Sequence, residues 1–231
     1  MTDASRLAAG DGAAAAGGPS SGNGMAGAPE QAADEAARLF ELRSAPVRDF
    51  AGQAAAVASA CHAMAARFHQ GGKLVVFGIG GSSTDAQHVA VEFVHPVIVG
   101  KRALPAISLT TDVATVTGVA AREGLAGVFA HQIRHLAEPA DLALGISADG
   151  NCESVLAGLR AARLLGMLTI ALAGGGGGAL AASPVVDHLL LARSADPRIV
   201  KEIQVTMYHV LWELVHVFLE QPGLLAPEVV R

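Results

Sequence analysis

Histidine and glutamate recur four residues apart in this chain, a spacing that places both side chains on one face of a helix. His88 and Glu92 follow a glycine-rich segment, and His209 and Glu213 lie near the end of the sequence. In one interpretation His209 faces a cleft, where Glu213 orients it and it acts as an acid/base or a metal ligand. In the other interpretation, the second pair belongs to an ordinary polar strip that faces solvent.

The segment before His88 has the order of a strand, a glycine loop and a helix. An apolar run from Leu74 to Phe77 leads into the loop from Gly78 to Ser83, and a helical pattern follows. Glycines let the backbone approach a ligand, and the free N–H groups of the following helix favour an anion, so the loop indicates a phosphorylated small molecule. Its spacing matches neither the dinucleotide fingerprint nor the P-loop. A tight turn that binds nothing is the alternative.

A second loop, which begins at Ser147, also leads from an apolar strand into a helix. The Ser147 hydroxyl is able to donate to a phosphate, whereas Asp149 would repel one unless it caps the helix or faces away. We expect Asp149 to be an ordinary helix N-cap and Cys152 to be a small buried residue. The five glycines from Gly174 to Gly178 follow another strand, and we interpret them as a slack linker rather than a flexible loop near the site.

Short apolar runs alternate with helical patterns along the chain, which predicts a mostly parallel sheet with helices on both faces. The predicted strands are Leu74 to Phe77, Ala106 to Leu109, Leu142 to Ile146, Leu168 to Leu172 and Val185 to Leu191. Helices are predicted from Glu30 to Arg43, from Val47 to His69 and from Arg198 to Glu220. Ligands of such sheets bind beyond the carboxyl ends of the strands, where both loops are expected to lie.

Length and composition bound the domain organisation. The chain has 231 residues, 52% of them hydrophobic, which suffices for one α/β domain, predicted over residues 28–221. Residues 1–27 are mostly Ala, Gly, Ser and Pro and are predicted to form a disordered tail. Residues 222–231 are predicted to form a C-terminal tail.

The charge and the cysteines bear on partners and location. A formal charge of −5 without runs of Lys or Arg argues against direct binding of DNA or RNA. The sequence shows no secretory signal and no apolar run of about 18 residues, so we expect a cytoplasmic protein without membrane contact. Cys61 and Cys152 form no CxxC pair, and both are expected to be reduced.

The last predicted helix is apolar around most of its circumference. Met207 and Leu214 lie on one side of it, and Tyr208, Leu211 and Trp212 lie on another, so one sheet surface cannot cover both. A narrow polar stripe on the same helix comprises Glu202, His209, Glu213, His216 and Glu220. A second subunit is expected to cover the remaining apolar side. We therefore predict a homo-oligomer in which Trp212→Glu disrupts assembly.

Several segments together resemble the sugar isomerase (SIS) domain of bacterial phosphoheptose isomerases in order and spacing. They are GIGGSSTDAQHVAVEF, PAISLTTD, GISADGNCESV, the five-glycine run and KEIQVTMYHVLWELV, within a resemblance from about Val47 to Glu220. It implies a flavodoxin-like three-layer sandwich on a five-stranded parallel sheet, assembled as a tetramer with active sites between subunits. It also implies an aldose–ketose isomerase that converts sedoheptulose 7-phosphate to a heptose 7-phosphate, commonly with zinc.

The resemblance also implies roles for single residues. His88, Glu92 and His209 match the family's metal ligands, and Glu92 and His209 match its catalytic base and catalytic histidine. Moving a carbonyl between C1 and C2 of a sugar proceeds through an enediol, which needs a base and an acid for the carbon-bound protons. A metal would polarise the oxygens. The residues expected to bind the substrate are Gly80, Gly81, Ser82, Glu92, Ser147, Asn151 and Lys201.

Other positions depart from the family's pattern. Ile79 stands where the family has Asn, and Lys201 stands where it has a metal-binding Gln. Its Asn-Asp pair is replaced by Ala121 and Arg122. The serine-rich phosphate loop retains Ser147 and has Ala148, Asp149 and Cys152 at its other matching positions. Because a lysine ammonium cannot ligate a cation, we expect zinc to bind weakly or substoichiometrically.

Two functions follow from this mixture of retained and lost residues. The leading hypothesis is a sugar-phosphate isomerase of altered specificity, since the three residues of the proton-transfer chemistry are retained. The alternative is a non-catalytic SIS module that binds a phosphosugar in a regulatory or scaffolding role, since several phosphate-contacting residue types are lost. In both cases the expected ligand is a phosphorylated sugar.

Overall fold

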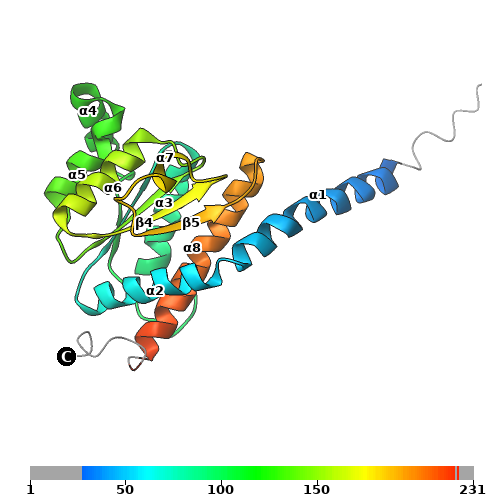
Figure 1. The fold of residues 1–231 in the computed structure, drawn as a ribbon, viewed down its shortest axis with the longest axis horizontal. Coiled ribbons are helices and arrows are strands. Elements are labelled where there is room, and N and C mark those ends of the chain that lie inside the picture. Colours follow the sequence, from blue (N-terminus) through cyan, green and yellow to red (C-terminus); the bar gives the residue numbers. More distant parts are fainter. Residues whose placement is uncertain (1–27, 222, 224–231) are drawn as a thin grey trace, which may run out of the picture. The chain divides into compact units, whose positions relative to one another are not determined.

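The computed structural model describes residues 28–221 and 223. The chain divides into two compact units, Met1–Glu41 and Leu42–Arg231, and the sheet and the candidate site belong to the second. In chain order the elements are α1 (Ala28–Ala51), α2 (Ala54–His69), β1 (Leu74–Gly78), α3 (Gly81–Val94), β2 (Ala106–Ser108), α4 (Val113–Glu123), the 3-10 turn η1 (Leu125–Gly127), α5 (Val128–Leu136), β3 (Leu142–Ser147), α6 (Glu153–Leu165), β4 (Leu168–Gly174), α7 (Gly178–Ala181), β5 (His188–Ala192) and α8 (Pro197–Glu220) (Figure 1).

The strands form one parallel sheet in the order β2-β1-β3-β4-β5. This confirms the predicted five-stranded parallel sheet. From β1 the chain runs outward to β2 at one edge and then returns to β3 on the other side of β1. In such sheets a ligand crevice forms where the connections diverge, outside the carboxyl ends of the strands. Gly78 at the end of β1 pairs with Ile146 of β3, so the loops after these two strands emerge side by side.

Alternate residues of each strand face opposite helical layers. Leu74 and Val76 of β1 belong to a core shared with α2, α3 and α8, whereas Val75 and Phe77 belong to a core shared with α5 and α6. Figure 1 shows α2 and α8 on one side of the sheet and α5 and α6 on the other. Because both faces are covered, every residue of β1 is buried, and the strand is a continuous apolar run without polar alternation.

The leading helices have different bounds from those predicted. One helix, α1, continues through Pro46 to Ala51, and the chain breaks only at Gly52 and Gln53, before α2. The predicted break between Arg43 and Val47 was therefore wrong. A proline fixes φ near the helical value and removes one hydrogen bond, and here the helix continues past it.

The two predicted tails, residues 1–27 and 222–231, lie outside the described residues except for Gly223. Among the helices that the structure describes, none combines the length and the hydrophobicity needed to cross a membrane.

The second apolar side of α8 is covered by the same chain. Trp212 is only 3% exposed, and its Nε1 donates a hydrogen bond to the backbone oxygen of Glu92 at 2.9 Å. His216 is also buried, with Nδ1 2.8 Å from the backbone oxygen of Trp212 and Nε2 2.9 Å from that of Arg102. The predictions that Trp212 faces a second subunit and that His216 belongs to a solvent-facing strip were therefore wrong. Helices α2 and α3 pack on α8 and bury these side chains.

We predict that Trp212→Glu destabilises the chain itself. The change removes buried packing and places a charge in the core, so the free energy of unfolding should fall by about 3 kcal/mol or more. Val217 on the same helix is 37% exposed and provides the matched control. Val217→Glu should change the stability by less than about 0.5 kcal/mol. Urea unfolding of both variants measures the difference, and wild-type unfolding of Trp212→Glu would contradict this placement.

Candidate active site

The glycine loop between β1 and α3 has the predicted order of strand, loop and helix. Helix α3 begins at Gly81, and Gly80 before it has a φ of +62°, a conformation that favours glycine. A Cβ added at Gly80 or Gly81 would meet no atom within 4 Å, whereas a Cβ at Gly78 would lie 2.7 Å from the Cβ of Ser82. The first glycine therefore permits close packing of β1 on α3, and the other two leave the backbone open to a ligand.

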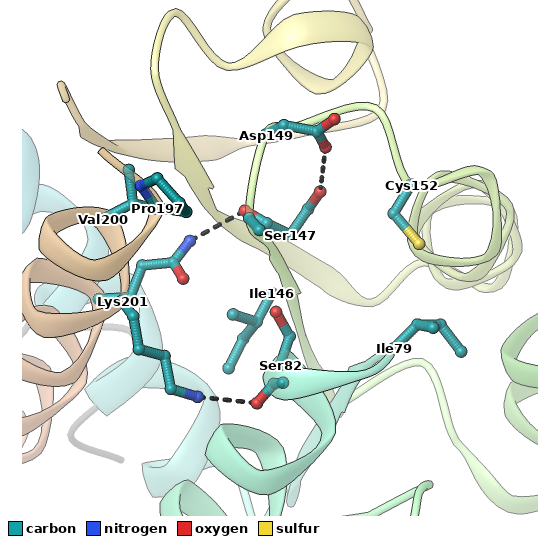
Figure 2. Close-up of a pocket in the computed structure, with 12 residues that line it drawn as sticks. Ile79, Ser82, Ile146, Ser147, Asp149, Cys152, Pro197, Val200 and Lys201 are labelled. Atoms are coloured by element: carbon teal, nitrogen blue, oxygen red, sulfur yellow. Dashed lines mark hydrogen bonds between the residues drawn. The ribbon is translucent and has the colours of Figure 1, made fainter. Parts of the chain in front are cut away.

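A cavity of about 400 Å³ lies between this loop, the loop after β3 and the first turns of α8 (Figure 2). The predicted substrate-binding residues that line it are Gly81, Ser82, Ser147 and Lys201. Gly80 lines a neighbouring cavity of about 190 Å³, and Ile79 lines both cavities. Cys152, predicted to be a small buried residue, is half-buried and lines the larger cavity. The two loops thus form one concave site at the divergence of β1 and β3.

Asp149 brings a negative charge to this cavity. Its Oδ1 accepts a hydrogen bond from the backbone N of Asn151 at 2.9 Å. It also accepts one from Oγ of Ser147 at 3.4 Å, which is drawn in Figure 2. The bond from Asn151 is the main reason that the pKa of Asp149 is lowered, so the carboxylate stays charged at neutral pH. The N-cap of α6 is Cys152, which corrects the prediction that Asp149 caps this helix. Asp149 instead closes a turn within the loop.

The five glycines after β4 pack against the loop after β3. A Cβ at Gly150 would overlap the carbonyl oxygen of Gly177, and a Cβ at Gly178 would lie 2.7 Å from Cγ of Asn151. The side-chain Oδ1 of Asn151 accepts a hydrogen bond from the backbone N of Ala179 at 3.0 Å. The prediction of a slack linker was therefore wrong, because residues without side chains allow two backbones to touch here. Asn151 does not line the larger cavity and holds these loops together.

Lys201 lies at the edge of the cavity with its ammonium group already paired. Its Nζ is 2.5 Å from Oδ2 of Asp85, whose side chain is only 4% exposed, and it donates to the backbone oxygen of Gly81 at 2.7 Å. Figure 2 shows the side chain reaching from α8 to the first turn of α3. Because Asp85 neutralises Lys201, the carboxylate of Asp149 leaves the cavity with a net negative charge. A phosphate bound there would experience repulsion from Asp149.

Removing the charge of Asp149 is expected to strengthen phosphate binding. Asp149→Ser and Asp149→Asn should each bind inorganic phosphate about tenfold or more tightly than the wild type, because a like charge leaves the cavity wall. Calorimetric titration with phosphate at low ionic strength measures the change. Glu153→Gln removes an exposed acid that pairs with Arg160 outside the cavity, and it should leave the affinity unchanged. Equal affinities for all four proteins would show that Asp149 does not affect the ligand.

His88, Glu92 and His209 come together where α3 and α8 pack side by side. Oε1 of Glu92 lies 3.2 Å from Nε2 of His88 and 3.9 Å from Nε2 of His209. One potential ligand atom from each residue lies within 4.8 Å of the others. Glu213, predicted to orient His209, is exposed, and the carboxylate beside His209 is that of Glu92.

The carboxylate of Glu92 is buried without a complete set of hydrogen bonds. Its side chain is 8% exposed, and its Oε2 accepts no hydrogen bond from any described residue. A buried oxygen without a partner is costly, so this position favours a cation, a proton or a ligand hydroxyl. Two histidines and one carboxylate are also the donor set of catalytic zinc sites that keep an open position. His88, Glu92 and His209 therefore fit a zinc ion.

Two residues of α8 that the sequence placed only among its apolar residues support this cluster. The hydroxyl of Tyr208 lies 2.9 Å from Nδ1 of His88, and Trp212 donates to the backbone oxygen of Glu92. Burial first, and then the carboxylates of Asp85 and Glu92, raise the pKa of Tyr208, so its hydroxyl keeps its proton at neutral pH. The sequence could have indicated that these two residues lie together, because Tyr208 and Trp212 are four residues apart and share one face of α8.

The cavity and the cluster lie along the same two helices. Gly81 and Lys201, near the beginnings of α3 and α8, line the cavity. The cluster residues His88, Glu92 and His209 lie about two to three turns further along these helices and are outside the cavity lining. The packing of α3 on α8 therefore fixes a cavity with hydrogen-bond donors and a cluster of acid/base groups in one arrangement.

The fold and these two loops define a SIS-domain protein. A family model described as "SIS domain" matches residues 44–174, more than half of the chain. The match includes the glycine loop, the loop after β3 and the first two residues of the cluster.

Comparison with known proteins gives a finer assignment. A phosphoheptose isomerase of Solidesulfovibrio magneticus is 40% identical over 184 residues, covering 80% of this chain and 89% of that protein. The solved structure of a phosphoheptose isomerase from Francisella tularensis has a TM-score of 0.75 and 31% identity, covering 80% of this chain and 98% of that one. A phosphoheptose isomerase from Neisseria gonorrhoeae has a TM-score of 0.72 and 28% identity, covering 79% and 97%. The chain therefore belongs to the phosphoheptose isomerase family of SIS-domain proteins.

Proposed function

We propose that the protein interconverts a ketose phosphate, such as sedoheptulose 7-phosphate, and the corresponding aldose through an enediol. Family membership makes it a sugar-phosphate isomerase of the aldose–ketose class. The finer proposal rests on one observation, the buried carboxylate of Glu92 with an unpartnered Oε2 beside two histidines. In the proposed reaction, this oxygen, which has no hydrogen-bond partner among the described residues, accepts a carbon-bound proton of the substrate.

Glu92 is the proposed base. Its Oε2 takes the proton from C1 of the ketose and returns it to C2, which forms the enediol and then the aldose. The geometry assists this step, because Oε2 has no other hydrogen-bond partner among the described residues and is free to accept the proton. His88, whose Nε2 lies 3.2 Å from Oε1 of Glu92, keeps the carboxylate oriented.

His209 is the proposed acid/base for the sugar oxygens. Its Nε2 lies 3.9 Å from Glu92, so a substrate beside the carboxylate is also within reach of the imidazole. It gives a proton to the carbonyl oxygen at C2 and takes one from the hydroxyl at C1. His88, Glu92 and His209 would also hold a zinc ion, which when bound would polarise the two oxygens in place of the proton from His209.

The cavity is the proposed site of the phosphate end. The hydroxyls of Ser82 and Ser147 and the open backbone at the beginning of α3 are suitable donors. Asp149 opposes them, so binding of the phosphate dianion should be weaker than in a loop of serines. A substrate preference different from that of the relatives is the expected consequence.

A phosphosugar-binding module without catalysis is the second candidate. The observation that favours it is again Asp149, which accepts a hydrogen bond from Ser147 and thereby engages the hydroxyl that the phosphate would use. A module of this kind would bind a phosphosugar and leave it unchanged. A cytoplasmic location and a homotetrameric assembly are part of the proposal by family resemblance.

Glu92→Gln should abolish isomerisation with little change in fold. We expect kcat to fall by about a thousandfold, because the amide keeps the shape of the carboxylate and cannot accept the carbon-bound proton. The assay follows aldose formation from a panel of ketose phosphates, with and without added zinc. Glu213→Gln is the matched control, since Glu213 is an exposed acid on α8 and should leave kcat unchanged. No turnover of any ketose phosphate by the wild type would favour the binding module.

A further inference from the structure

The imidazole of His88 is held from both sides. The hydroxyl of Tyr208 lies 2.9 Å from Nδ1, and Oε1 of Glu92 lies 3.2 Å from Nε2. A neutral imidazole carries one N–H, so one ring nitrogen donates a hydrogen bond while the other accepts one. Because the phenol hydroxyl is able both to donate and to accept, Tyr208 is compatible with either tautomer of His88.

The two tautomers give the His88 and Glu92 pair different properties. With the proton on Nε2, His88 donates to the carboxylate of Glu92, and Tyr208 donates to Nδ1. With the proton on Nδ1, His88 donates to the oxygen of Tyr208, and the lone pair of Nε2 faces the carboxylate. Two acceptors that face each other attract a cation, so only the second tautomer is suited to binding a metal ion.

We propose that Tyr208 is a positioning residue that supports both tautomers of His88 and thereby lets the His88 and Glu92 pair change between a hydrogen-bonded state and a cation-binding state. The inference rests on the proposed function only in treating this cluster as the active site. It adds a role for Tyr208, which the sequence placed only among the apolar residues of α8.

The surroundings of Tyr208 suit such a role. The residue is 2% exposed, and its ring packs nearly perpendicular to that of His88, with a centroid distance of 5.3 Å. Its ring centroid also lies 4.9 Å from that of His209, so the tyrosine lies against both histidines. Core packing fixes the hydroxyl while the side chain of His88 is 44% exposed. Tyr208 does not line the 400 Å³ cavity, so its effect should be confined to the cluster.

Tyr208→Phe tests the proposal, because phenylalanine keeps the ring and removes only the hydroxyl. The variant should bind zinc about 10- to 100-fold more weakly than the wild type, since the Nδ1–H tautomer loses its acceptor. Competition with a chromophoric chelator measures this affinity without substrate. In the isomerase assay the variant should lower kcat and leave KM for the sugar phosphate unchanged.

Nitrogen NMR of histidine-labelled protein measures the tautomer of His88 directly. In the wild type, His88 should be the Nε2–H tautomer without metal and the Nδ1–H tautomer after zinc is added. In Tyr208→Phe without metal, the Nε2–H tautomer should be less populated than in the wild type, because Nδ1 has lost the hydroxyl that donates to it. Both measurements are independent of turnover, so an inactive protein that shows these changes would contradict the proposed function and support this inference.

Two further variants separate positioning from stability. In a His88→Ala background, Tyr208→Phe should change zinc affinity by less than about twofold, because the residue through which Tyr208 acts is absent. Thr169→Val removes another buried hydroxyl, which donates to Val185 at the opposite end of β4 from the cavity, and it should leave zinc affinity unchanged. Equal zinc affinity of wild type and Tyr208→Phe, or no zinc binding by the wild type, would overturn the proposal.

Discussion

The packing of α8 against α3 is the constraint on which the rest of the site depends. Polar contacts cross it in the same order along both helices, among them Lys201 to Asp85, Tyr208 to His88, and Trp212 to the backbone oxygen of Glu92. Both helices therefore run in the same direction from the carboxyl edge of the sheet. Such packing buries Glu92, and burial of a carboxylate with an unpartnered oxygen is costly. The apolar core beneath α8 offsets that cost and holds the carboxylate in place.

The same contact determines the charge of the neighbouring cavity. Asp85 forms an ion pair with the ammonium group of Lys201, which would otherwise be available to a phosphate at the cavity edge. Asp149 then adds a carboxylate whose pKa is lowered by the backbone N–H of Asn151, so it remains charged. The acid/base cluster therefore keeps the residues of the family's pattern, whereas the cavity departs from that pattern at Asp149 and Lys201. Under the proposed function, this difference predicts an isomerase whose substrate preference departs from that of its relatives.

The sheet, the glycine loop and the approach of His88, Glu92 and His209 were predictable, because they depend on local periodicity and on motifs whose spacing survives. The contact made by the five-glycine run, the N-cap of α6 and the burial of Trp212 and His216 on α8 were not predictable. The glycine run forms a contact between two backbones that are distant in sequence, and Trp212 is covered by helices from elsewhere in the chain. Neither feature is visible in the local sequence pattern. Side-chain pairs between distant segments, such as that between Tyr208 and His88, likewise follow from packing, which periodicity alone does not specify.

Proton transfer by Glu92 is the central claim, and solvent isotope incorporation tests it most directly. The protein is incubated with a ketose phosphate in D₂O, and NMR follows deuterium at C2 of the aldose and at C1 of the recovered ketose. An enediol formed by a base that exchanges its proton with solvent predicts deuterium at both carbons with the wild type and none with Glu92→Gln. Turnover without any deuterium at carbon would indicate direct transfer of hydrogen between C1 and C2. That result would contradict the role assigned to the buried carboxylate.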